Sequence, residues 1–158
     1  MSRIKDAYSR YDIAKSLLDK GHYAGAIREA QQCVELSVKA LLDTLNIIYI
    51  VVGHGKKKAI PHDVSEKIPE AFEKIKPLVG KYEFDLQRRY FAQAATLLRL
   101  LTAMKDHAAY GIRELQVSAQ DIFNFVFAKE LATILVSLSY ESYLHMFMML
   151  DRLKSESQ

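Results

Sequence analysis

Apolar residues recur every three or four positions along most of this chain, and this spacing constrains its fold more than any other feature. The first apolar stripe runs from Ile4 to Leu18 and the second from Tyr23 to Leu45. A third runs from Leu86 to Met104, and a fourth apolar stretch lies between Ile122 and Leu138. Residues three or four positions apart share one face of an α-helix, so each stretch is predicted to form a helix.

Residues that end or begin helices stand at the expected places. Gly21 is a good stop for the first helix, and the short link Lys20–His22 predicts an antiparallel hairpin of the first two helices. Gly111 closes the third helix. The last helix is predicted to begin at Ser118, with Asp121 completing a capping box, and to run to about Leu153. Its apolar residues cover more than one face, which is typical of a central helix or of one shared with a second subunit.

The stretch between the second and third long helices is the least regular. Ile47–Val52 is either a continuation of the second helix or a short extended segment, and the glycines that follow predict a loop. Asp63 is the expected N-cap of a short helix, with Glu66 completing a capping box. Pro77 ends this stretch.

These elements predict an all-α fold, an up-and-down helical bundle of four long helices plus one short helix. With 158 residues the chain is long enough for one domain with a real core, and glycine and proline are scarce. We expect a single helical domain over residues 1–153 and a disordered C-terminal tail over residues 154–158.

The composition excludes several classes of protein. Cys33 is the only cysteine, so no internal disulfide forms, and we expect it to be a small core residue. The clustered Cys and His of a zinc site are absent, and we expect neither a metal nor a cofactor. Met1–Asp6 is charged where a signal peptide is apolar, and the run Ile47–Val52 is far shorter than a bilayer span. The chain is therefore predicted to be cytoplasmic, without a membrane partner.

Three segments resemble the HEPN domain family in sequence and order. Glu35–Leu42 matches the pattern Glu-Leu-x-x-Lys-Ala-Leu-Leu that follows a glycine-marked turn in that family. His62–Val64 is similar to its His-Asp-hydrophobic element, and Ala108–Gly111 is similar to its Ala-x-Tyr segment. The resemblance implies a dimeric HEPN-like bundle with a role linked to nucleotide or RNA, in part of the family beside a nucleotidyltransferase partner.

The resemblance also raises the possibility of ribonuclease activity. Many HEPN domains are metal-independent RNases that carry an Arg, four to six residues and then a His. Arg99 and His107 come closest, with seven residues between them. On a continuous helix they would lie about 80° apart around the axis and roughly 12 Å apart along it, which is poor geometry for gripping one phosphate. We keep Arg99 and His107 as the candidate catalytic pair, which a helix break or a dimer partner would have to complete.

Residues near His107 form the best concentration of phosphate-binding chemistry. Lys105 and Arg113 offer charge-assisted hydrogen bonds, and Tyr110 offers a ring that stacks on a base or a hydroxyl open to modification. These three are the candidate nucleotide- or RNA-binding residues. The alternative is that Lys105 and His107 only complement the negative end of the helix dipole.

Two further basic features can be explained by a structural role as well as by a functional one. Lys39 stands four residues after Glu35, a spacing that favours an ion pair on one helix. Lys56–Lys58 could meet phosphates but is typical of a solvated loop. With a net charge of only +3, any anionic ligand must be recognised by a local patch.

The sequence therefore favours a homodimer that binds nucleotide or RNA, or a nucleotidyltransferase partner, without strong catalysis of its own. The alternatives are a toxin-like, metal-independent RNase with a non-standard Arg/His site and a purely structural interaction bundle.

Overall fold

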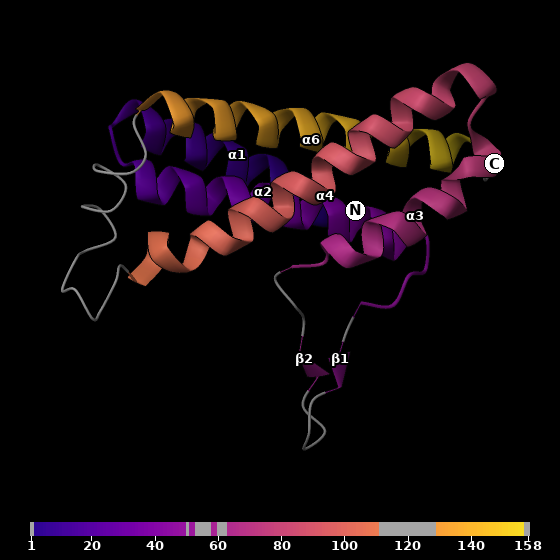
Figure 1. Cartoon of the computed structure of the whole chain (residues 1–158), viewed down its shortest axis with the longest axis horizontal. Helices are drawn as coiled ribbons and strands as arrows, with labels where there is room; N and C mark the ends of the chain where they lie inside the picture. Colours follow the sequence, from indigo (N-terminus) through magenta and orange to yellow (C-terminus); the bar gives the residue numbers. More distant parts are fainter. Residues whose placement is uncertain (1, 50, 53–57, 60–62, 111–128, 157–158) are drawn as a thin grey trace.

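The computed structural model describes residues 2–49, 51–52, 58–59, 63–110 and 129–156 (Figure 1). Its elements, in chain order, are the helices α1 (Ser2–Asp19) and α2 (Tyr23–Thr44), the strands β1 (Val51–Val52) and β2 (Lys58–Ala59), the 3₁₀ turn η1 (Ser65–Lys67), α3 (Ile68–Ile75), the 3₁₀ turn η2 (Lys76–Leu78), α4 (Lys81–Tyr110) and α6 (Lys129–Glu156). The described residues thus contain four long helices and one short one, as the apolar spacing predicts.

The first two helices form the predicted antiparallel hairpin. Gly21 has a φ of 75°, in the left-handed region that ends helices and favours glycine. The N–H of Gly21 bonds the carbonyl of Leu18 at 3.0 Å, and that of His22 bonds the carbonyl of Leu17 at 2.9 Å. These two bonds satisfy carbonyls at the end of α1 and turn the chain into α2.

The region between α2 and α4 settles one open alternative and corrects one prediction. α2 ends at Thr44, and Val51–Val52 pairs antiparallel with Lys58–Ala59, so the end of the Ile47–Val52 run is extended. The predicted capping box at Asp63 and Glu66 is wrong. Asp63 instead accepts a hydrogen bond from the N–H of Ser65 at 2.9 Å, two residues on, while the N-cap position of η1 is Val64, which makes no side-chain cap bond.

The two last helices extend the predicted apolar stripes. α4 continues to Tyr110, while the predicted closure at Gly111 and the predicted start of the last helix at Ser118 lie outside the described residues. α6 continues to Glu156, so residues 154–156 are helical where the tail was expected. Residues 157 and 158 are not described.

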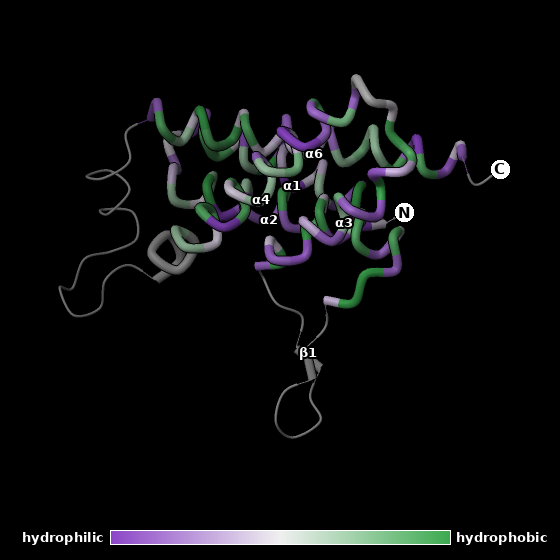
Figure 2. Tube along the Cα trace, turned by 45° about the vertical axis from the view of Figure 1, so that its right-hand side comes forward, coloured by the Kyte–Doolittle hydropathy of each residue, from purple (hydrophilic) through white to green (hydrophobic). Residues whose placement is uncertain are grey.

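The long helices run up and down, and α2 contacts α1, α4 and α6 (Figure 1). Along each helix hydrophobic residues alternate with hydrophilic ones at helical spacing (Figure 2). The core lies where the apolar faces meet, and its fully buried side chains include Ile27, Leu42, Ile75, Leu98 and Leu101. Cys33 is also fully buried, as predicted, and burial raises the pKa of its thiol to about 12.

Candidate functional site

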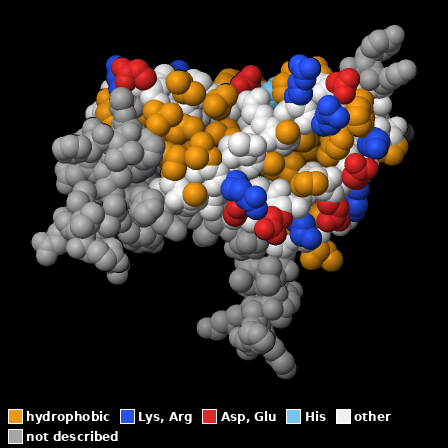
Figure 3. Space-filling model, in the orientation of Figure 1, with side chains coloured by type: hydrophobic (Ala, Val, Ile, Leu, Met, Phe, Trp, Pro, Cys, Tyr) orange, Lys and Arg blue, Asp and Glu red, His pale blue; other side chains and the backbone are white. Residues whose placement is uncertain are grey.

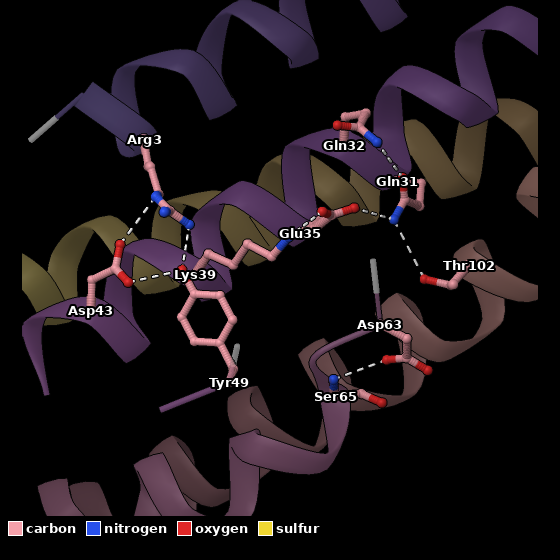
Figure 4. Close-up of polar contacts among 10 residues, drawn as sticks. All are labelled: Arg3, Gln31, Gln32, Glu35, Lys39, Asp43, Tyr49, Asp63, Ser65 and Thr102. Carbon is pink, nitrogen blue, oxygen red and sulfur yellow. Dashed lines mark hydrogen bonds and ion pairs between the residues drawn. The ribbon is translucent and has the colours of Figure 1, made fainter. Parts of the chain in front are cut away.

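A buried polar row runs along α2. Gln31, Glu35 and Lys39 follow one another at four-residue spacing and are 0%, 3% and 4% exposed. Lys39 Nζ lies 2.5 Å from Glu35 Oε1, and Gln31 Nε2 donates to Glu35 Oε2 at 2.7 Å (Figure 4). The predicted ion pair of Glu35 and Lys39 is confirmed. Its burial was not predicted, and it places a charged pair inside an apolar bundle.

The polar row faces α4 at one end. Gln31 Nε2 reaches Thr102 Oγ1 at 3.5 Å, and Thr102 lies on α4 between the candidate residues Arg99 and Lys105 (Figure 4). Hydrogen bonds inside the row compensate the desolvation of its polar atoms. The row therefore fixes the position of α4 beside α2 at the level of the candidate residues.

At its other end the row meets Tyr49, which is only 5% exposed. Lys39 Nζ lies 5.9 Å from the centre of the Tyr49 ring. The Tyr49 hydroxyl accepts a hydrogen bond from Arg3 and donates one to Asp43 Oδ1 at 2.8 Å (Figure 4). Burial, followed by the hydrogen bond to Asp43, raises the pKa of Tyr49 to about 12. The start of α1, the end of α2 and the segment after it are thereby joined.

Arg99 lies beside the η1 turn and pairs with its acidic side chains. Arg99 Nε is 4.0 Å from Asp63 Oδ2, and Arg99 Nη2 is 3.6 Å from Glu66 Oε1. The Arg99 side chain is 67% exposed, so each of these pairs is weak. An anionic ligand could compete with the two carboxylates for this guanidinium.

A cavity of about 490 Å³ adjoins Arg99. Its lining combines a largely apolar surface with a few polar groups: Ser65, Glu66, Pro69, Ala95, Thr96, Arg99 and Leu100. Ser65 is 6% exposed, and within the described part of the chain its Oγ has no hydrogen-bond partner. An apolar wall beside a guanidinium suits a flat ring that carries an anionic group.

A second, more apolar groove of about 350 Å³ lies between α4 and α6. It shares Thr96 and Leu100 with the first cavity, and Leu97, Leu135 and Leu138 also line it. Hydrophobic side chains gather on this face, which α4 crosses (Figure 3). The two hollows together form one continuous surface along the outer side of α4.

The predicted site residues are only partly placed. Arg99 is described in full, whereas Lys105, His107 and Tyr110 have a described backbone on α4 and side chains outside the description. Arg113 lies outside the described residues. α4 is one helix from Lys81 to Tyr110. The helix break that could have brought Arg99 and His107 together therefore does not occur.

Sequence reasoning missed several residues of this site. Gln31 extends the Glu35–Lys39 spacing by one further turn, and three polar residues in step on an apolar helix are a signal that could have been used. No local signal marks Tyr49 or Ser65. Their roles follow from contacts with residues distant in sequence.

The fold and this site define an all-α, up-and-down helical bundle with a buried polar row beside an arginine-flanked cavity. The sequence profile of the HEPN domain family matches residues 1–83, more than half of the 158 residues, and the chain therefore belongs to this family. None of the curated proteins and none of the solved structures compared with the chain matches it.

The described residues hold no helix with the length and apolar character to cross a bilayer. They also hold no group of three or more His, Cys, Asp or Glu side chains arranged to bind a metal ion.

The family match ends at residue 83, before Arg99, so the roles of the candidate residues on α4 are not carried over by it.

Proposed function

We propose that the chain is a dimeric HEPN-family domain that binds a nucleotide or RNA, or a nucleotidyltransferase partner, without strong catalysis of its own. The observation that carries this proposal is the cavity flanked by Arg99, with its largely apolar walls. Family membership supports a role linked to nucleotide or RNA.

The chemistry of the cavity fits one nucleotide unit. Pro69, Ala95 and Leu100 supply an apolar surface for a base. Arg99 exchanges its weak pairs with Asp63 and Glu66 for a phosphate, to which a guanidinium donates two parallel hydrogen bonds. If the ligand is RNA, we propose that Lys105, Tyr110 and Arg113 contact further phosphates or bases of the RNA strand.

The spacing on α4 supports binding without cleavage. Arg99 and His107 are eight residues apart on one uninterrupted helix, so their side chains start about 80° apart and roughly 12 Å along the axis. This placement is poor geometry for a guanidinium and an imidazole of one chain to grip the same phosphate. General acid–base catalysis requires the imidazole within hydrogen-bond reach of the reacting oxygen.

Titration of the purified chain with mononucleotides and a short single-stranded RNA tests the binding. Arg99→Ala should weaken binding by about tenfold to a hundredfold, because a hydrogen bond to a charged group is worth roughly 1.5–3 kcal/mol. Arg88→Ala is the matched control, since Arg88 is 66% exposed on the same helix and, among the described residues, pairs only with Asp85 at 4.0 Å. Equal affinity of the two variants would refute the assignment of the cavity.

A second experiment separates binding from catalysis and from a purely structural role. The chain is incubated with RNA in excess chelator beside its His107→Ala variant. Cleavage that survives the chelator and disappears in the variant would overturn the proposal in favour of a metal-independent RNase. A nucleotide present at a hundred times its dissociation constant should add about 2.7 kcal/mol of stability. An unchanged melting temperature with every nucleotide and RNA would favour a structural bundle.

A further inference from the structure

α1 packs beside α6 (Figure 1). Five aromatic side chains form a continuous row along this contact. The aromatic row consists of Tyr8 and Tyr11 on α1 and Tyr140, Tyr143 and Phe147 on α6. The rings of Tyr11 and Tyr140 stack at 4.3 Å between centroids, and those of Tyr8 and Tyr143 lie 5.6 Å apart. Tyr143 continues the row to Phe147 at 6.0 Å.

The aromatic row is not covered by the rest of the described chain. Tyr8 is 43% exposed and Phe147 is 46% exposed, and the three rings between them are half-buried. Among the described residues, none donates to or accepts from the hydroxyls of the four tyrosines. Large rings with free hydroxyls are the side chains most enriched at the centres of protein interfaces.

Charged residues on α1 flank the aromatic row in alternating sign. Lys5, Asp12, Lys15 and Asp19 share one face of the helix with Tyr8, because the successive spacings from Lys5 through Tyr8 to Asp19 are three, four, three and four residues. We call these four charged residues the charged stripe. All four are exposed, and none forms an ion pair within the part of the chain that the structure describes. Other exposed charges, such as Lys67 with Glu70, do find partners. The four side chains of the charged stripe can therefore form ion pairs with a second molecule.

The charge pattern selects the kind of partner. Two lysines and two aspartates sum to zero, so this face does not attract the phosphates of a nucleic acid, and Asp12 next to Tyr8 would repel them. An alternating stripe is instead complementary to itself when a second copy runs antiparallel. A two-fold axis close to Tyr8 places Lys5 against Asp12 of the second copy, and the symmetry repeats that pair.

We propose that the aromatic row and the charged stripe are the surface through which two copies of this chain associate. The rings bury against the second copy, and the alternating charges set its antiparallel direction. This inference rests on the dimer in the proposed function and names the surface that forms it, while nucleotide binding at the Arg99 cavity is independent of it.

The molar mass of the full chain in solution, measured by light scattering or sedimentation over a range of concentrations, tests the proposal. The unaltered chain should be a dimer. Tyr8→Asp should raise the dissociation constant at least about thirtyfold, the loss typical of a residue at the centre of an interface. Leu86→Asp, at an equally exposed apolar residue on α4, should leave the mass unchanged. Circular dichroism verifies that each variant is folded.

A charge exchange tests the direction of pairing without removing any ring. Lys5→Asp and Asp12→Lys, each alone, place like charges together and should weaken the dimer by about tenfold. The double variant restores opposite charges and should recover the original dissociation constant. Arg88→Asp on α4 is the control for a change of net charge.

Each result decides between the possibilities. A dimer whose stability is unaffected by every variant of this face overturns the inference and leaves the proposed dimer with another surface. A chain that is monomeric at all concentrations overturns both. If Tyr8→Asp and Lys5→Asp instead weaken RNA binding and leave the mass unchanged, the face belongs to RNA and the inference is wrong. Nucleotide affinity measured with the Arg99 variants stays a separate test of the proposed function.

Discussion

The spacing of Glu35 and Lys39 would be the same for a buried and for an exposed ion pair, and in this fold the pair is buried. Both side chains are 5% exposed, and Gln31 donates a further hydrogen bond to the carboxylate. In a low-dielectric interior the attraction between the charges roughly offsets their desolvation, so the pair adds little net stability. Removing one partner alone is costly, because the charge that remains stays buried after losing this ion pair.

Lys39→Ala should therefore lower the free energy of unfolding by about 3–5 kcal/mol, measured by denaturant titration. Lys67→Ala is the control, since Lys67 pairs with Glu70 at 3.7 Å with both side chains more than 40% exposed, and it should cost about 0–1 kcal/mol. Replacing Glu35 and Lys39 together by apolar residues of similar volume should recover most of the loss. Similar losses for the two lysine variants would show that the pair is effectively solvated.

Spacing in the sequence predicted this pair, but its burial could not be predicted in the same way. The i,i+4 rule concerns two side chains on one helix and takes no account of what covers them. Here α4 supplies part of the cover, through the contact of Gln31 with Thr102, 71 residues later. For the same reason the buried Ser65 hydroxyl and the Tyr49 bridge had no sequence signal.

At the scale of elements, helix existence was predictable and helix ends were less so. Gly21 marks the end of α1 because its left-handed φ is a local requirement. The capping box at Asp63 was wrong because Asp63 has two local options. Its carboxylate bonds the N–H of Ser65, two residues on, and α3 begins later, at Ile68, with Pro69 in its first turn. A tetrapeptide pattern does not distinguish these outcomes.

The hairpin of α1 and α2 allows a test of Gly21. A Cβ at this position would meet nothing within 4 Å, so a substitution changes only the backbone energy. Gly21→Ala should destabilise the chain by about 1–2 kcal/mol, because an alanine is strained at a φ of 75°. Gly21→Asn should cost less, since asparagine tolerates this region. Thermal unfolding of the two variants provides the comparison, and an equal loss would contradict a purely conformational cause.

At the scale of the whole molecule, the up-and-down order followed from stripes and short links, but the meeting of distant segments did not. The aromatic row requires α1 beside α6, and the Arg99 cavity requires α4 beside η1. The aromatic row and the cavity each bring together residues that are far apart in sequence, and such contacts produce no repeating pattern along the chain. Amphipathic spacing shows that a helix has a buried face but does not identify the helix that covers it.

Tyr49 joins three segments at one end of the bundle and should control its alkaline stability. The folded pKa of Tyr49 is raised to about 12 from the ordinary 10.0, so the folded state holds this proton more tightly than the unfolded state. This contribution is fully present below about pH 10 and is lost as the pH rises towards about 12. At neutral pH, Tyr49→Phe removes the bonds to Arg3 and Asp43 and should cost about 1–3 kcal/mol.

The comparison of unaltered chain and Tyr49→Phe at rising pH isolates this residue, because all other titrating groups are common to both. Above pH 10 only the unaltered chain gains an ionised Tyr49 in its unfolded state, so its advantage over the variant should shrink steadily. Denaturant titrations between about pH 8 and pH 12 measure the difference in the free energy of unfolding. A difference that stays constant over that range would mean that the Tyr49 hydroxyl ionises as an ordinary tyrosine does, and that burial and Asp43 do not hold its proton.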